Sequence, residues 1–198
     1  MPQICPHFHL SLQSGCDETL KRMNRHYTTA LYLEKCGILR QYFDRPALTT
    51  DVIVGFPGET EEEFAQTERF LETVHFSDMH IFKYSKRRGT KAADMPNQID
   101  PQIQSVRSEK LIALGERMKD DFLEACKDQE QIVLIEEETE IDGTKYMTGH
   151  SKNYIRCAFE MDGLVPNMVI KGTINSKLNE EFVFVKELIE FLEYIYLR

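Results

Sequence analysis

The stretch that decides the fold is LTTDVIVGFPGET, which runs from Leu48 to Thr60. Its first part, Leu48 to Val54, is rich in β-branched side chains and predicts a buried strand. The glycines and proline of Gly55 to Gly58 predict a turn. Thr60 followed by Glu63 has the pattern of a capping box, in which the hydroxyl and the carboxylate each bond an otherwise free amide at a helix N-terminus. The stretch therefore predicts a strand, a glycine turn and a helix in direct succession.

The same rhythm occurs on both sides of this stretch. HFHLSLQSG, His7 to Gly15, precedes it, and MHIFKYSKRRGT, Met79 to Thr90, follows it. Strands that alternate with helices indicate βαβ units and a parallel sheet. About three such units are too few to close a barrel. We therefore predict an α/β fold that is a partial (β/α) barrel, followed by a long helix that Asp100 and Pro101 begin. Its expected apolar stripe is Ile103, Val106, Leu111, Leu114, Met118 and Phe122.

The first predicted strand has two chemically different faces. Its apolar residues Phe8, Leu10 and Leu12 should pack against the helices. The opposite face would then carry polar side chains, which favours a cavity that holds a ligand. An edge strand with a solvated face is the alternative. The polar set is His7, His9, Ser11 and Gln13.

The glycine turn after the second strand does not favour a phosphate site. A helix N-terminus attracts anions, but here carboxylates already occupy it and would repel a phosphate. We expect the exposed backbone edges of this turn to meet a neutral ring such as adenine. The carboxylates are those of Glu59, Glu61, Glu62 and Glu63.

A basic cluster follows the third predicted strand, although the chain as a whole carries a net charge of −9. This charge argues against binding nucleic acid through a generally basic surface. The cluster lies at the strand end where ligands bind, which favours contact with a polyanion; a solvated loop is the alternative. Its cations are Lys86, Arg87, Arg88 and Lys91.

Near residue 128 the sequence pattern changes from that of a long helix to that of short strands. Five short strands with turn signals follow, and Asp142-Gly143 is a strong hairpin signal. This pattern predicts a small all-β barrel of the oligonucleotide-binding kind, with Lys152, Arg156 and Lys171 as candidate RNA contacts. The predicted domains are residues 1–127, residues 128–188 and a tail of 189–198, which is either a short helix or a sixth strand.

Cysteine usage and hydropathy restrict the possible classes further. The five cysteines are scattered without a CxxC spacing, so we expect neither a disulfide framework nor a metal site made by this chain alone. No apolar run approaches the length of a membrane span, and the N-terminal residues do not have the pattern of a signal peptide. A cytoplasmic location is therefore expected.

Three segments carry a resemblance to a known family. HLSLQSGCDETLKRMNRHYT (residues 9–28), TTDVIVGFPGETEEEF (49–64) and FKYSKRRGTKAADMPNQI (82–99) resemble the second half of a radical S-adenosylmethionine tRNA methylthiotransferase. The last segment is more similar to the subgroup that acts on threonylcarbamoyladenosine, since the isopentenyladenosine subgroup tends to have prolines where Lys86 and Arg88 stand. Residues 128–187 resemble the tRNA-contacting TRAM domain of these enzymes.

The resemblance implies a function and a set of site residues. Family members add a methylthio group to an adenosine beside the tRNA anticodon and hold iron–sulfur clusters on cysteine sets that this chain lacks. It implies that the chain is the C-terminal portion of such an enzyme, is inactive alone, and has as partners tRNA and the missing N-terminal half, not a membrane or DNA. No catalytic residue and no metal ligand are therefore expected within the chain. The residues that the resemblance places near S-adenosylmethionine are Gln13, Ser14, Arg25, Asp51, Val54, Gly55, Phe56 and Tyr84.

Two other hypotheses stay open at this point. The chain could be a free-standing, non-catalytic module that binds tRNA or other RNA through the basic cluster and the small barrel. It could also be the product of a partial reading frame that folds poorly, because an incomplete barrel leaves strand edges unpaired.

Overall fold

The computed structural model describes residues 3–160 and 163–194. The chain divides into two compact units, one of residues 8–121 and one that contains residue 122 onward together with the N-terminal residues up to His7. Within the described residues, no helix combines the length and hydropathy needed to cross a membrane.

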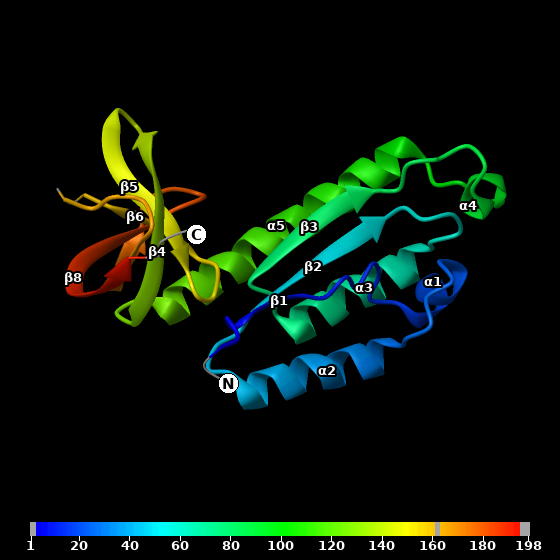
Figure 1. Ribbon diagram of the computed structural model, residues 1–198. Helices are drawn as coiled ribbons and strands as arrows, with labels where there is room; N and C mark the ends of the chain where they lie inside the picture. Colours follow the sequence, from blue (N-terminus) through cyan, green and yellow to red (C-terminus); the bar gives the residue numbers. More distant parts are fainter. Residues whose placement is uncertain (1–2, 161–162, 195–198) are drawn as a thin grey trace. The chain divides into compact units, whose positions relative to one another are not determined.

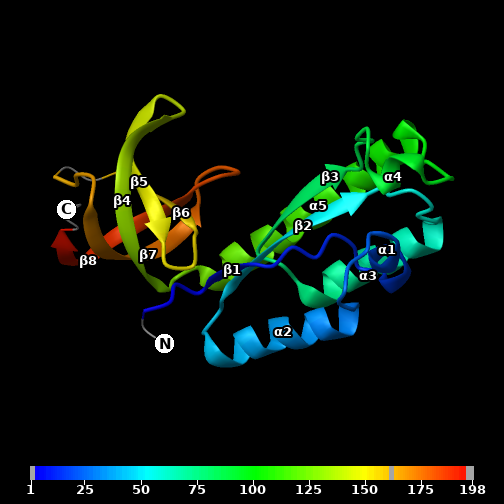
Figure 2. The ribbon, with the colours of Figure 1, turned by 45° about the vertical axis from the view of Figure 1, so that its right-hand side comes forward.

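The first unit is built around a parallel three-stranded sheet with the strand order β1-β2-β3. Figures 1 and 2 show β2 and β3 as neighbouring arrows that point the same way. The predicted alternation of strands and helices is confirmed. The elements are β1 (His7–His9), α1 (Asp17–Arg22), α2 (Thr29–Tyr42), β2 (Ala47–Val54), α3 (Glu61–Val74), β3 (Asp78–Lys83), α4 (Lys91–Asp94) and α5 (Pro101–Cys126).

The first strand is shorter than the sequence predicts, although its chain continues beside β2. The amide of Gln13 still donates to the carbonyl of Asp51 at 2.8 Å. Between these ends, the buried hydroxyl of Thr50 donates to the carbonyl of Leu10 at 2.6 Å and accepts from the amide of Leu12 at 2.9 Å. A side chain thus replaces part of the backbone ladder, which explains why regular strand structure ends at His9.

One face of the sheet packs on three helices and forms the core of the unit. Phe8, Leu10 and Leu12, which the sequence predicts to pack against the helices, all belong to this packing. Helix α3 begins with the predicted capping box of Thr60 and Glu63. The buried members of the core include Tyr32 and Cys36 from α2, Phe64, Leu71 and Val74 from α3, Leu111, Leu114 and Met118 from α5, and Val52, Val54, Phe76 and Met79 from the sheet side.

The predicted apolar stripe of α5 is wrong at its N-terminal end. Ile103 and Val106 are 46% and 65% exposed. The inner positions of this first part belong instead to Gln104 and Arg107, which bond the turn after β2. Polar groups of that turn need partners when they are buried, and this requirement outweighs the burial of two aliphatic side chains.

The second unit contains a closed five-stranded barrel with the strand order β4-β5-β6-β8-β7. The predicted Asp142-Gly143 hairpin is confirmed, with φ of 50° and 79° at the two turn residues. Gly149 lies so close to β4 that an added Cβ would stand 1.8 Å from the carbonyl oxygen of Leu134, so only glycine fits this crossing. The strands are β4 (Glu130–Ile141), β5 (Thr144–Ser151), β6 (Arg156–Phe159), β7 (Met168–Lys177) and β8 (Val183–Tyr194).

The tail of the sequence does not form the expected separate element. β8 runs on to Tyr194, so the greater part of the predicted tail continues the fifth barrel strand and is neither a helix nor a sixth strand. The prediction for residues 195–198 lies outside the described residues.

Candidate functional site

An aromatic pair stands at the carboxyl ends of β2 and β3. The amide of Tyr84 donates to the carbonyl of Val54 at 2.9 Å, which extends the pairing of the two strands by one residue. Phe56 and Tyr84 then meet edge to face, with ring centroids 5.3 Å apart. The Tyr84 hydroxyl is buried and has no hydrogen-bond partner within the described part of the chain. A buried, unpaired hydroxyl beside an aromatic ring can receive a polar atom of a planar ligand.

A buried carboxylate holds the glycine turn in shape. The amide of Gly55 donates to Glu59 Oε2 at 2.7 Å, and Nη1 of Arg107 donates to the same oxygen at 2.8 Å. The carbonyl of Gly55 accepts from Nε2 of Gln104 at 3.2 Å. Both polar backbone groups of Gly55 are thus already bonded inside the chain. A ring bound here would contact the Gly55 backbone by packing rather than by hydrogen bonds.

Burial governs the charge of this carboxylate. Burial raises the pKa of Glu59, and the hydrogen bond from Gly55 and the guanidinium of Arg107 only partly oppose it. Arg107 also donates to Glu61 at 3.1 Å. The sequence identified the carboxylates but not Arg107. The sequence did contain a signal for it, because Arg107 stands four and seven residues before Leu111 and Leu114 and so shares their buried side of α5.

Gln13 and Ser14 are both buried, but Gln13 bonds to the sheet through its backbone, whereas the Ser14 side chain bonds toward the helices. Gln13 is buried, with a left-handed φ of 71°, and bridges to Val52. The hydroxyl of Ser14 is fully buried, pairs with that of Thr67 on α3 at 3.2 Å and accepts from the amide of Cys16 at 3.2 Å. The Ser14 side chain therefore joins the sheet to α1 and α3, and the residue presents no exposed surface to a ligand.

Two arginines near the end of α1 have different surroundings. Arg22 forms a bidentate pair with Glu63, at 2.8 and 2.6 Å, and this hydrogen-bonded pair raises the pKa of Arg22 although burial opposes it. Glu63 is the same residue that closes the capping box of α3. Arg25, the predicted carboxylate partner, is exposed in the loop after α1. The structure thus commits Arg22 to the fold and leaves the Arg25 side chain accessible.

The face of the sheet opposite the helices carries a compact polar cluster. His9 Nε2 lies 3.2 Å from Asp51 Oδ2, and His80 Nδ1 lies 3.2 Å from Asp51 Oδ1. Ser11 Oγ donates to Asp51 at 3.2 Å, and His9 Nδ1 lies 3.0 Å from Thr49 Oγ1. Burial raises the pKa of Asp51, but the hydrogen bonds from His9, His80 and Ser11 together outweigh this effect, so that the pKa is lowered.

The predicted tRNA contacts fall into two groups. In the first unit, the four cations that follow β3, three in the loop and Lys91 at the start of α4, are exposed, and none of them forms an ion pair with a described residue. In the barrel, Arg156 pairs with Glu181 at 2.8 Å and Lys171 pairs with Glu130 at 2.6 Å, while Lys152 is exposed. The cations available to an anionic ligand are therefore Lys86, Arg87, Arg88 and Lys91 in the first unit and Lys152 in the barrel.

The cysteines do not converge on a metal-binding site. Cys5 is exposed, and Cys16, Cys36, Cys126 and Cys157 are buried and form no disulfide with a described residue. Among the described residues, the group of three or more potential metal ligands consists of His9, Asp51 and His80, without a thiol. Thiolate sets of the kind that hold iron–sulfur clusters are thus not formed by the described residues.

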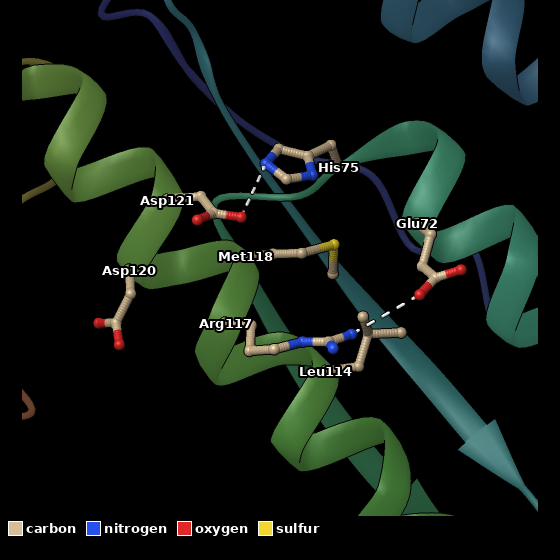
Figure 3. A pocket seen from close by; sticks show the side chains of 7 residues that line it. All are labelled: Glu72, His75, Leu114, Arg117, Met118, Asp120 and Asp121. Carbon is tan, nitrogen blue, oxygen red and sulfur yellow. Dashed lines mark ion pairs between the residues drawn. The ribbon is translucent and has the colours of Figure 1, made fainter.

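A hollow of about 490 Å³ lies between α3 and α5, on the helix side of the sheet (Figure 3). Its rim carries two ion pairs, His75 with Asp121 at 3.7 Å and Glu72 with Arg117 at 3.6 Å. Met118 forms part of its apolar lining. The hollow is lined by α3, by His75 at its C-terminal end and by α5, not by the carboxyl ends of the strands. It contains none of the residues that the sequence predicts for a ligand.

Comparison with known proteins agrees with the sequence resemblance. Residues 2–71 match the Radical SAM superfamily. The chain is 38% identical over 160 residues to the threonylcarbamoyladenosine tRNA methylthiotransferase MtaB of Bacillus subtilis, covering 80% of this chain and 35% of that protein. It is 45% identical over 118 residues to a tRNA-2-methylthio-N(6)-dimethylallyladenosine synthase of Caldicellulosiruptor saccharolyticus, covering 60% and 25%. A synthase of the same name from Corynebacterium efficiens is 36% identical over 191 residues, covering 96% and 35%.

These matches define both the resemblance and its extent in this chain. The aligned parts span 25–35% of the lengths of these three relatives. The match to the Radical SAM superfamily, residues 2–71, includes the strands β1 and β2 and the turn whose geometry is described above. The predicted resemblance is confirmed: over part of their length, this chain is similar to the radical S-adenosylmethionine tRNA methylthiotransferases.

Proposed function

We propose that this chain contributes the strand-end part of an S-adenosylmethionine site and an RNA-binding barrel to a tRNA methylthiotransferase. The match of residues 2–71 to the Radical SAM superfamily supports a cofactor of this kind. The single observation that carries the proposal is the buried, unpaired hydroxyl of Tyr84 beside the ring of Phe56 at the carboxyl ends of two parallel strands. Ligands of parallel α/β sheets bind at this end of the strands.

The residues present fit the nucleoside part of the cofactor. The half-buried Tyr84 offers one hydroxyl without a partner, the buried ring of Phe56 supports the Tyr84 ring from the side, and the Val54 carbonyl holds the Tyr84 backbone. Gln13 lies at the end of the neighbouring chain segment, and the exposed guanidinium of Arg25 suits the carboxylate of the methionine part. Bound S-adenosylmethionine would supply radical chemistry. The residues of this chain would orient it, and the Glu59–Arg107 pair would hold the turn that carries Phe56.

The described residues do not fit an iron–sulfur cluster. Its usual ligands are cysteine thiolates, and the only described group of three potential ligands lacks them. No reaction step is therefore assigned to a cluster on this chain. We infer that the cluster ligands of the complete enzyme belong to the part of the relatives that this chain does not match.

We propose threonylcarbamoyladenosine in tRNA as the substrate. The name of the Bacillus subtilis relative supports this nucleoside, whereas the names of the other two relatives give dimethylallyladenosine. The loop from Lys86 to Lys91 supports contact with the tRNA backbone, because its exposed cations lack carboxylate partners among the described residues. The second unit is proposed as a TRAM-like barrel on the basis of its closed five-stranded sheet.

The test is a nucleoside analysis of tRNA from cells in which the gene has been deleted. We expect mass spectrometry to show threonylcarbamoyladenosine without its methylthio group, and the gene to restore the group. A gene that carries Tyr84→Ala should restore it poorly, while Tyr42→Ala, at a tyrosine 68% exposed on α2, should restore it fully.

Three other outcomes would change the proposal. If the methylthio group disappears from dimethylallyladenosine instead, the enzyme class stands and the proposed substrate is wrong. If neither nucleoside changes, the proposed activity is overturned. If in addition the chain binds tRNA with an affinity that falls steeply with salt, a non-catalytic RNA-binding role replaces it.

A further inference from the structure

We propose that His9, Asp51 and His80 form a binding site for a borderline divalent transition metal such as Zn²⁺ or Co²⁺. This site lies on the helix-free face of the sheet and is separate from the proposed cofactor and RNA contacts, apart from Asp51. The potential ligand atoms of the three residues all lie within 4.8 Å of one another. Two imidazoles and one carboxylate are a donor set that these metals accept.

The strand register brings the three side chains together. Asp51 of β2 is the register partner of His80 of β3, and the two side chains project from the same face. His9 stands at the end of β1, on the other side of β2. One carboxylate on the central strand is therefore flanked by one imidazole from each neighbouring strand. Three adjacent strands provide a rigid base for such a set, which loops do not.

The distances suit a small metal ion. Ligand atoms at about 2.0–2.1 Å from a tetrahedral metal are about 3.3 Å apart. His9 and His80 each lie 3.2 Å from an oxygen of Asp51. The side chains of His9 and His80 are 39% and 61% exposed, so their rings can approach each other without displacing core residues. Three protein ligands would leave a position open for water or another ligand.

A neighbouring hydroxyl can orient the first imidazole in both the free and the metal-bound states. His9 Nδ1 lies 3.0 Å from Thr49 Oγ1. In the free state the Thr49 hydroxyl can donate to Nδ1, while Nε2–H donates to Asp51. When a metal takes the Nε2 lone pair, the proton moves to Nδ1 and the same hydroxyl accepts it. Ser11 Oγ, 3.3 Å from His9 Nε2, is placed to bond a metal-bound water.

The donor atoms also predict which cations are rejected. Mg²⁺ and Ca²⁺ prefer oxygen ligands, and this cluster offers them one carboxylate and two imidazoles. The sequence prediction that the chain lacks metal ligands considered cysteine sets. The histidine–aspartate set depends on strand register, which that reasoning did not include.

The test is a titration of the metal-free, untagged chain with Co²⁺, followed by its visible absorption. We expect one Co²⁺ per chain with nitrogen and oxygen ligation, and at least a tenfold loss of affinity in His80→Gln. The matched control His26→Gln replaces an exposed histidine outside the cluster and should bind as the wild type does. His80 is itself exposed, so its substitution leaves the fold intact, which circular dichroism checks.

A second readout identifies the ligand atoms. With Zn²⁺, the imidazole ¹⁵N resonances of His9 Nε2 and His80 Nδ1 should shift, and those of His26 should not. The proposal is overturned if Co²⁺ does not bind, if His80→Gln binds it equally well, or if Mg²⁺ competes at similar concentration. It is also overturned if a thiolate charge-transfer band appears and Cys5→Ser abolishes the binding, because the exposed thiol would then be the ligand. None of these results depends on methylthiotransfer, so they leave the proposed function to its own test.

Discussion

The two faces of the three-stranded sheet differ in what they contribute, although the same strands form both. The face toward the helices carries residues such as Val52, Val54 and Met79, which are buried with α2, α3 and α5. The opposite face carries Asp51, His80 and Phe82, with Phe82 51% exposed. Successive side chains of a strand point to opposite faces of the sheet. The residues of one face can therefore stabilise the fold, while the residues next to them in the sequence stay accessible to ligands.

The largest effect is expected between an aromatic residue of the core, just before β3, and one on the helix-free face of the sheet. Phe76→Ala should lower the free energy of unfolding by about 3–5 kcal/mol, because this fully buried ring leaves a cavity in the core. Phe82→Ala should cost no more than about 0.5 kcal/mol, as an exposed position does. Urea denaturation of both variants measures the difference. Equal losses would show that the two faces are not distinct in this way.

A charge buried beside the glycine turn should give the next largest effect. Arg107→Leu should lower the free energy of unfolding by about 3 kcal/mol at pH 7.5, because the buried Glu59 loses its cation. Lys110→Leu, on the same helix, removes a more exposed pair with Glu68 and should cost less than about 1 kcal/mol.

The pH dependence of the same variant sharpens this prediction. Burial raises the pKa of folded Glu59 above its usual 4.5, so the folded state holds the proton more firmly than the unfolded state. The contribution of Glu59 to stability therefore falls as pH rises above 4.5, and Arg107→Leu should steepen this fall. Urea midpoints at pH 5 and pH 7.5 test it; a variant that is equally destabilised at both values would contradict the buried charge.

A smaller effect of opposite sign is expected on the helix-free face. The pKa of folded Asp51 is lowered, so its charged form stabilises the fold above the usual value of 3.8, and this contribution disappears as pH falls through the lowered value. Asp51→Asn should cost about 1 kcal/mol at pH 7 and less as pH falls below 3.8, the side chain being 27% exposed. Glu62→Gln, at an exposed pair with Arg69, is the control and should show little change at either pH.

The smallest change in stability is expected where a ligand, rather than the fold, uses the side chain. Tyr84→Phe should alter the free energy of unfolding by less than about 0.5 kcal/mol, because the hydroxyl has no partner among the described residues. It should weaken S-adenosylmethionine binding about fivefold, the value of one hydrogen bond. Calorimetry compares it with Tyr42→Phe, which should bind unchanged.

Local signals in the sequence predicted those parts of the fold that local chemistry determines. The capping box at Thr60 and the hairpin at Asp142-Gly143 each depend on a few adjacent residues, and both are confirmed. The early end of β1 was not predictable in the same way, because the Thr50 hydroxyl that replaces its ladder comes from another strand.

The candidate site shows the same division. The polar alternation of the first strand indicated a functional face, and Phe56 and Tyr84 were identified at the strand ends. The meeting of His9 with His80 requires the register of three strands, and the role of Arg107 requires the packing of α5 on the turn. Both are tertiary facts that no short window of sequence contains.

The most direct test of the account is to map S-adenosylmethionine binding on this chain by nuclear magnetic resonance. The account predicts chemical-shift changes at Phe56 and Tyr84, at the strand ends, with none at Leu114 and Met118 in the hollow between α3 and α5. Changes confined to that hollow, or no changes at saturating cofactor, would contradict the claim that the strand ends form the ligand site.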